Sequence, residues 1–150
     1  MKTMSTLDFD RVTPGQTLPP LTKRVTVDQI RQYAEASGDR NPIHLDETFA
    51  RSAGLPGVIA HGMLTMAFAN QMVTDWLGDR SLLKSLHGRF AGMVLPGDDV
   101  TCSGSVASKD DETRRLVINL LVTNQRGEKV FNKGVAEAEF PPQRSNTHAA

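Results

Sequence analysis

The hydrophobic and polar positions of this chain follow two different periods. From residue 80 onward, apolar and polar residues alternate, most regularly over residues 116–123 and 136–140. A period of two is typical of strands that bury one face. Turn-forming residues interrupt the alternation at 96–98, 109–111 and 125–127, as expected between neighbouring strands. The pattern predicts an antiparallel meander of four strands in this part of the chain.

The first part of the chain begins with an extended segment at 21–27 and then changes to a helical period. Thr26 offers an N-cap, and Gln29 follows three residues later, which is the capping-box spacing. Gly38 favours the left-handed conformation that ends a helix. We therefore expect a helix between Thr26 and Gly38, with an apolar face formed by Val27, Ile30, Tyr33 and Ala34.

Two further helices are expected before the strands begin. Asp46 can cap a brief helix that runs through Ala53. Residues His61 to Leu77 predict the longest helix, with a stripe of Met63, Met66, Ala67, Asn70 and Val73. A helix this apolar has to be covered, and helices set against one antiparallel sheet give the α+β class. A single sheet curled around the long helix satisfies this requirement, although periodicity alone does not select it.

Charge and cysteine content narrow the range of partners. Lys and Arg number 17, Asp and Glu number 17, and the formal net charge is zero. No overall field attracts nucleic acid or anionic lipid, and no run approaches the ~20 apolar residues of a membrane span. Cys102 is the only cysteine, which excludes an internal disulfide and fits a reducing compartment. We expect a cytoplasmic protein that binds neither nucleic acid nor membrane.

The expected boundaries follow from the length and from the composition of the two ends. A chain of 150 residues suits a single domain, which we place at 1–140. The segment 141–150 is polar and begins with two prolines, so we expect a flexible tail there. The first eight residues contain no apolar stretch long enough for a signal peptide.

The segment from Tyr33 to His44 is rich in reactive side chains. It places a carboxylate, a carboxamide and an imidazole in one expected loop, those of Asp39, Asn41 and His44. Hydration of an enoyl thioester needs one group that takes a proton from water and one that gives a proton to carbon. Asp and His can divide that work. By itself the segment is also compatible with an ordinary Asn-Pro turn followed by a histidine.

A second informative segment, Ile59-Ala60-His61-Gly62-Met63, stands at the expected start of the long helix. Free backbone N–H groups at a helix N-terminus can stabilise an enolate-like oxygen. Gly62 has no side chain, so a substrate could approach its amide closely. A histidine followed by glycine at this place is often only a cap. For His61, fixing the entering loop is favoured over contact with substrate.

Taken together, the two segments resemble a known family. The pattern Gly38-Asp39-x-Asn41-Pro42-Ile43-His44-x-Asp46, followed by Ile59-Ala60-His61-Gly62-Met63, is similar to the motif of the MaoC-type (R)-specific enoyl-CoA hydratases and (3R)-hydroxyacyl-carrier-protein dehydratases. The likeness continues through residues 73–79 and through Arg89-Phe90, and so covers most of residues 7–140. Within the family it is nearest to the mycobacterial dehydratases of fatty-acid elongation.

The resemblance implies a hot-dog fold, in which a curved antiparallel five-stranded sheet wraps around a long central helix. It also implies a dimer in which two sheets join edge to edge. The family acts on acyl-CoA or acyl-carrier-protein thioesters without a metal or other cofactor. Carried over by position, Asp39 and His44 hold the catalytic water, Asn41 supports their loop and the Gly62 amide binds the thioester oxygen. A further polar position of the family falls near Asn70.

Several alternatives stay open at this stage. A hot-dog thioesterase would use a carboxylate to activate water against the carbonyl carbon, and the Asp39 to His44 motif argues against it. The chain could also be an obligate or non-catalytic subunit of a heterodimer, because the mycobacterial branch of the family forms heterodimers. The sequence leaves undecided the acyl chain length, the carrier, the direction of the reaction, and which of Asp39 and His44 gives the proton to carbon.

Overall fold

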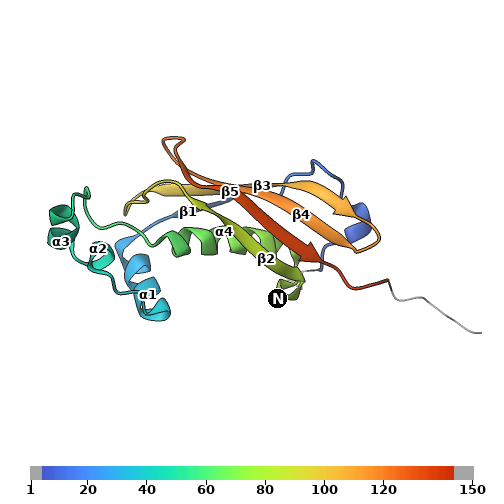
Figure 1. Cartoon of the computed structure of the whole chain (residues 1–150), viewed down its shortest axis with the longest axis horizontal. Coiled ribbons are helices and arrows are strands. Elements are labelled where there is room, and N and C mark those ends of the chain that lie inside the picture. The colour runs from blue at the N-terminus through green and yellow to red at the C-terminus, as the bar shows by residue number, and fades with distance from the viewer. Residues whose placement is uncertain (1–4, 144–150) are drawn as a thin grey trace, which may run out of the picture.

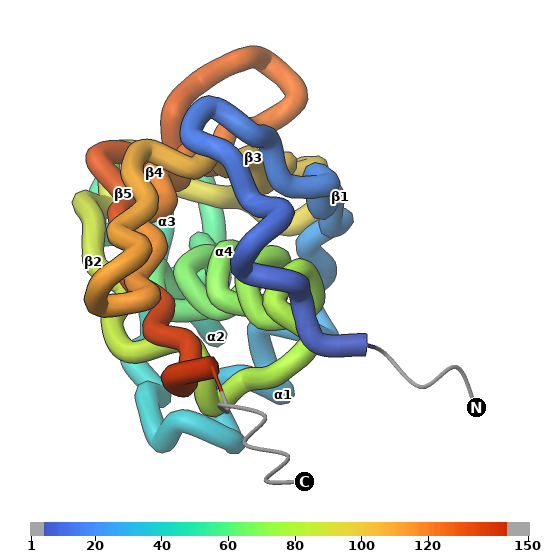
Figure 2. Tube along the Cα trace, turned by 90° about the vertical axis from the view of Figure 1, so that its right-hand side faces the viewer, coloured from blue at the N-terminus to red at the C-terminus, as the bar shows by residue number. Residues whose placement is uncertain are grey.

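The computed structural model describes residues 5–143. Its main feature is a five-stranded antiparallel sheet that curls around one long helix, α4 (Gly62–Leu77) (Figures 1 and 2). This is the α+β hot-dog arrangement predicted above. The strands are β1 (Leu21–Arg24), β2 (Leu83–Phe90), β3 (Asp99–Asp110), β4 (Arg115–Asn124) and β5 (Lys129–Glu139).

The order of the strands in the sheet is β1-β3-β4-β5-β2. Strands β3, β4 and β5 form the expected meander, with Ile118 of β4 opposite Val106 and Ala136. The predicted four-strand meander is wrong for β2, which pairs with β5 instead of β3. Residues 91–98 carry the chain from β2 to the far side of the meander, and this crossover leaves β2 as one edge of the sheet.

Helix α4 fills the concave side of the sheet. Its buried residues are Leu64, Thr65, Phe68, Ala69, Met72, Val73 and Leu77, and the helix ends at Gly78, whose φ of 73° is left-handed. The predicted stripe is buried only in part: Val73 is fully buried and Met66 packs against the core, whereas Met63 is 53 % exposed and Ala67 and Asn70 are also exposed. Apolar residues occur around the whole circumference of α4, so the period could not identify the buried face.

Residues 26–61 lie beyond one end of the sheet in Figure 1, and we call them the helical segment. They hold three short helices, α1 (Val27–Ser37), α2 (Pro42–Leu45) and α3 (Glu47–Ser52). The capping box of Thr26 and Gln29, the left-handed Gly38 and the N-cap at Asp46 are confirmed. Val27 was expected on the apolar face of α1 but is 41 % exposed, because it lies at the end of the helix.

Helix α2 was expected to be loop. Asn41 acts as its N-cap, since the side-chain oxygen accepts a hydrogen bond from the Ile43 amide at 3.2 Å. Pro42 occupies the first helical position, where a missing N–H does no harm. The Asn-Pro pair therefore begins α2, whereas α1 has already ended at Gly38. As a result, His44 lies on a helix and not on a free loop.

The two ends of the described chain lie against the body of the protein. The Leu7 amide donates to the Leu77 carbonyl at 2.8 Å, at the end of α4. Of the predicted tail, residues 141–143 are described. The Pro141 carbonyl oxygen accepts a hydrogen bond from Arg114, and the Gln143 side chain donates one to Asp10. The rest of the predicted tail, 144–150, lies outside the described residues. Within residues 5–143, no helix has the length and apolarity needed to cross a membrane.

Candidate active site

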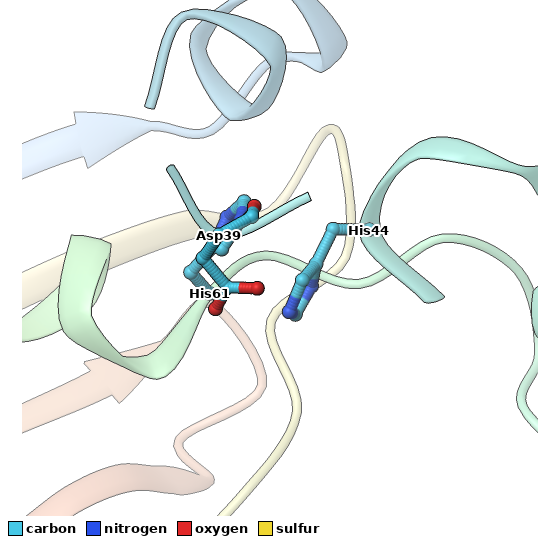
Figure 3. Close-up of side chains that lie close together, drawn as sticks. All are labelled: Asp39, His44 and His61. Carbon is cyan, nitrogen blue, oxygen red and sulfur yellow. The ribbon is translucent and has the colours of Figure 1, made fainter. Parts of the chain in front are cut away.

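The side chains of Asp39, His44 and His61 meet at one place, where the helical segment joins the start of α4 (Figure 3). Asp39 lies between α1 and α2, His44 on α2, and His61 immediately before α4. One carboxylate oxygen of Asp39 and one ring nitrogen of each histidine lie within 4.8 Å of one another. Three of the residues predicted from the sequence are therefore brought together.

Asp39 is held by hydrogen bonds to its main chain and to its carboxylate. Its amide donates to Ser37 Oγ at 3.2 Å, and its Oδ1 accepts from the Asn41 amide at 3.2 Å. Its carbonyl oxygen lies 2.9 Å from His61 Nε2. The residue is nevertheless exposed, so the second carboxylate oxygen can meet water or a substrate.

His44 is fixed in orientation by the chain that follows α3. Its Nδ1 lies 2.7 Å from the carbonyl oxygen of Ile59. A carbonyl oxygen can only accept, so Nδ1 carries the hydrogen and Nε2 keeps a free lone pair in the neutral ring. The His44 amide donates to Asn41 at 3.0 Å, and the side chain is 9 % exposed. The supporting role predicted for Asn41 therefore has a structural basis, the start of α2.

Gly62 is the first residue of α4, and the preceding His61 side chain makes no capping hydrogen bond within the described part of the chain. The Leu64 amide donates to the His61 carbonyl oxygen at 3.1 Å, whereas the Gly62 and Met63 amides precede the first intrahelical hydrogen bond and stay available. The helix dipole favours a negative charge beside them. A Cβ added at Gly62 would lie 3.0 Å from the ring of Phe90. Phe90 and Met93, which are 53 % and 47 % exposed, make the surface at this end of α4 apolar together with Met63.

Asn70 does not join this cluster. Eight residues separate it from Gly62, which is about 12 Å along a helix. Its exposed side chain lines a groove of about 440 Å³ along α4, together with Ala67, Gln71, Thr74, Asp75, Arg80 and Leu83. The role predicted for Asn70 stays a prediction.

Glu47, at the start of α3, is a supporting residue that the sequence did not reveal. Its carboxylate accepts a hydrogen bond from the Val58 amide at 3.0 Å and pairs with Arg51 at 2.9 Å. The Val58 hydrogen bond holds the pKa of the Glu47 carboxyl below its ordinary value. An acidic residue in the first turn of a helix is common, so position alone pointed to nothing more. Glu47 ties α3 to the stretch of chain that carries Ile59 and His61.

Two histidines and a carboxylate are also a set that can bind zinc or iron. The geometry here does not suit an ion. The His44 and His61 rings stack with centroids 3.8 Å apart and planes at 26°. Their lone pairs lie in these two nearly parallel planes, so both cannot point at one ion close to the rings. His44 Nδ1 and His61 Nε2 are moreover engaged with carbonyl oxygens.

The arrangement suits acid/base chemistry on a water molecule. Two groups up to 4.8 Å apart can both bond to one water, because each hydrogen bond spans about 2.8 Å. The carboxylate of Asp39 and the free Nε2 of His44 are both acceptors, so such a water would present its oxygen to a third partner. The amide at the start of α4 supplies a donor next to this pair.

The chain was compared with known proteins. The sequence profile of the family described as MaoC like domain matches residues 10–126. The fatty acid synthase subunit beta of Aspergillus oryzae is 49 % identical over 118 residues, which is 71 % of this chain and 5 % of that protein. This chain thus spans about one twentieth of the length of that relative.

Solved structures share the fold over nearly the whole chain. The R-hydratase PhaJ1 from Pseudomonas aeruginosa has a TM-score of 0.82 at 29 % identity, with 92 % of this chain and 88 % of that chain covered. The ChsH1-ChsH2 complex from Mycobacterium tuberculosis gives a TM-score of 0.76 at 25 % identity, with 86 % and 98 % covered.

Proposed function

Because this chain belongs to the family of MaoC-like domains, we propose that it is a hydro-lyase acting on acyl thioesters. It adds water to a trans-2-enoyl thioester to give a (3R)-3-hydroxyacyl thioester, or removes water in the reverse direction, in fatty-acid metabolism. The carrier is coenzyme A or acyl carrier protein. The observation that carries this proposal is the approach of the Asp39 carboxylate and a His44 ring nitrogen to within 4.8 Å, beside the amides at the start of α4.

In the hydration direction, one water molecule lies between Asp39 and His44. One of the two groups takes a proton from it while its oxygen bonds to C3 of the enoyl group. The electron pair of the C2–C3 double bond moves onto C2 and the thioester carbonyl, and a proton delivered to C2 completes the addition. Both proton transfers take place on one side of the substrate, because Asp39 and His44 are adjacent.

The negative charge that develops on the thioester oxygen needs a donor. We assign this role to the Gly62 amide, which lies in the positive end of the α4 dipole. The Phe90 ring packed against Gly62 limits water near that oxygen, which strengthens such a hydrogen bond.

We further propose that the chain works as a dimer. Strand β2 is an edge strand in residues 5–143, and a free edge favours pairing with another strand. Met63, Phe90 and Met93 are exposed apolar side chains near the site, and a second subunit would cover them. Whether that subunit is an identical copy or a related hot-dog chain is open, since one structural neighbour is the ChsH1-ChsH2 complex. Light scattering after size exclusion on the chain expressed alone distinguishes the two.

The activity is tested by following the loss of enoyl absorbance when the purified protein meets crotonyl-CoA and longer enoyl-CoA substrates. Asp39→Asn and His44→Gln should each lower turnover by about 10²–10⁴-fold, the range expected for loss of an acid/base group. An (S)-specific 3-hydroxyacyl-CoA dehydrogenase should refuse the product. The matched control is Asp28→Asn, which changes an exposed carboxylate on α1 and should keep full activity.

Unchanged turnover in both site variants would contradict the assignment of Asp39 and His44. Release of free thiol without hydration would favour a hot-dog thioesterase. A wild-type chain that is inactive alone, and becomes active with a second hot-dog chain, would identify it as an obligate subunit.

A further inference from the structure

His61 has no part in the proton transfers proposed above, and yet it is the most enclosed member of the site. Its side chain is 2 % exposed. One face of its ring stacks on His44, with centroids 3.8 Å apart and planes at 26°. It also packs against Tyr33 of α1, at 4.8 Å and 57°. The ring thus joins α1, α2 and the start of α4.

The hydrogen bond of His61 fixes its tautomer. Its Nε2 lies 2.9 Å from the main-chain carbonyl oxygen of Asp39, which can only accept, so Nε2 carries the hydrogen. His44 is in the opposite tautomer, with the hydrogen on Nδ1 toward Ile59. The two stacked rings therefore use opposite nitrogens to hold the main chain.

The other nitrogen of His61, Nδ1, is buried and has no hydrogen-bond partner among residues 5–143. A buried polar atom without a partner is rare in folded proteins and is found at sites that serve a function. Adding a proton to Nδ1 would bury an N–H without an acceptor. It would also place a positive charge on a ring whose centroid is 3.8 Å from that of His44, which is itself positively charged whenever it holds a proton during the reaction. The surroundings therefore favour the Nε2–H tautomer of His61.

We propose that His61 is a positioning residue with two separable effects on the reaction. Its N–H holds the main chain of Asp39, which sets the distance between the carboxylate and His44. Its ring provides a π-face for the imidazolium form of His44, which occurs whether His44 takes a proton from water or delivers one to carbon, an attraction of the cation–π kind. This inference rests on the proposed acid/base function of Asp39 and His44, and it adds the residue that keeps the pair in place.

Three substitutions separate the two effects. His61→Gln keeps an N–H donor near the position of Nε2 and removes the stacked ring, whereas His61→Phe keeps a flat ring and removes the donor. His61→Ala removes both. We expect each single loss to lower kcat by about tenfold and the alanine variant by about a hundredfold, with KM little changed, because misplacement of a reacting group acts on the chemical step. Thermal melting identifies any variant that fails to fold, and Asp28→Asn, at an exposed position of α1, is the control.

Nitrogen-15 NMR of the histidine rings tests the inference without any substrate, so it stands apart from a failure of the proposed function. In the wild type at neutral pH, His61 should show the Nε2–H tautomer and His44 the Nδ1–H tautomer. In His61→Ala, the ring signals of His44 should shift and broaden as the stacked neighbour is lost. A His61 that carries hydrogens on both nitrogens, or a folded His61→Ala variant with wild-type kcat, would overturn the inference.

Discussion

The sheet with α4 and the helical segment are stabilised in different ways. The sheet and α4 bury a continuous set of apolar side chains, among them Ile118, Phe131 and Leu77, all fully enclosed. The helical segment buries few apolar residues, and its short helices depend on local caps at Thr26, Asn41 and Asp46. Both histidines of the candidate site belong to this second region, His61 at its last position.

Under the proposed function, this difference separates the residues that stabilise the fold from those that carry out the reaction. A close-packed core resists small changes in volume, so it can hold α4 and the Gly62 amide in a fixed place. Asp39 and His44 are placed instead by a few hydrogen bonds, each of which contributes only about 0.5–1.5 kcal/mol. We therefore expect substitutions in the core to alter unfolding and those in the helical segment to alter turnover.

The largest expected effect on stability is in the core. Ile118→Ala should lower the free energy of unfolding by about 2–5 kcal/mol, because it leaves a cavity in the central strand β4. Ile118→Val, at the same position, should cost only about 0.5–1.5 kcal/mol. Urea unfolding measures both, and the folded fraction of each should keep its kcat. A large fall in kcat without a change in stability in either Ile118 variant would contradict the expectation that substitutions in the core alter unfolding and not turnover.

A substitution at Asp98, directly before β3, tests how much a buried carboxylate contributes to the stability of the sheet. Burial by itself would raise the pKa of this carboxyl, but hydrogen bonds from Gln125, the Leu95 amide and Arg126 lower it below its ordinary value. A carboxyl whose pKa is lowered by folding stabilises the folded protein at any pH above its ordinary pKa, roughly 3.9. This stabilisation is lost as the pH falls through the lower pKa that the carboxyl has in the folded protein. Asp98→Asn should therefore destabilise the protein at pH 7 by about 1.5–3 kcal/mol.

The measurement for Asp98 is the free energy of unfolding from pH 7 down to pH 3. The difference between wild type and Asp98→Asn should shrink as the pH falls. Asp111→Asn, whose carboxylate is 83 % exposed, is the control and should follow the wild type. A difference that stays constant with pH would mean that the substitution disturbs only the packing at this position and that the charge of Asp98 contributes nothing.

A substitution at Glu47 tests whether changes in the helical segment lower turnover without lowering stability. Glu47→Ala removes the acceptor for the Val58 amide, so the chain toward Ile59 and His61 loses its tie to α3. We expect kcat to fall about tenfold, because small displacements of a reacting group are costly. The unfolding midpoint should change little, since the residue is exposed and away from the core. Glu112→Ala, in the exposed turn after β3, is the control, and equal kcat in both variants would contradict the role of Glu47.

The smallest expected effect is at Cys102, which is fully buried on β3. Burial raises the pKa of its thiol from 9.0 to about 12, so at pH 8 the folded protein presents almost no thiolate to a disulfide reagent. Labelling should be slow in buffer and fast in urea, with no loss of activity before unfolding. Because the pKa of the Cys102 thiol is higher in the folded protein than in the unfolded chain, the contribution of this thiol to stability is present below pH 9. It is lost as the pH rises toward 12. Rapid labelling of the active protein would show that the sheet opens locally.

Much of the helical segment could be predicted because its signals are local. Thr26 with Gln29, Gly38 and Asp46 act on neighbours within a few residues, and the resemblance supplied the identity of the fold. The four-residue helix α2 was missed because an Asn-Pro pair was taken only as a stop. Its N-cap function depends on the conformation of the residues that follow.

The remaining errors concern contacts between distant parts of the chain. Hydrophobic periodicity predicts that β2 and β5 are strands but not that they pair with each other. The buried face of α4 likewise depends on where the sheet lies. Glu47 and Val58 form a hydrogen bond because the chain after α3 turns back toward the start of that helix. The stacking of His61 on His44 was likewise invisible in the sequence, where the two residues appeared as separate motifs.

The order of the strands also has a consequence for the growing polypeptide. Strand β2 and helix α4 are synthesised before β5, and β5 follows the end of β2 by about 40 residues, which is several seconds of translation at roughly 5–20 residues per second. During that interval the apolar surface of α4 is without most of its sheet and β2 is without its partner. We expect this nascent stage to be the one at which exposed apolar surface and an unpaired strand edge most favour aggregation.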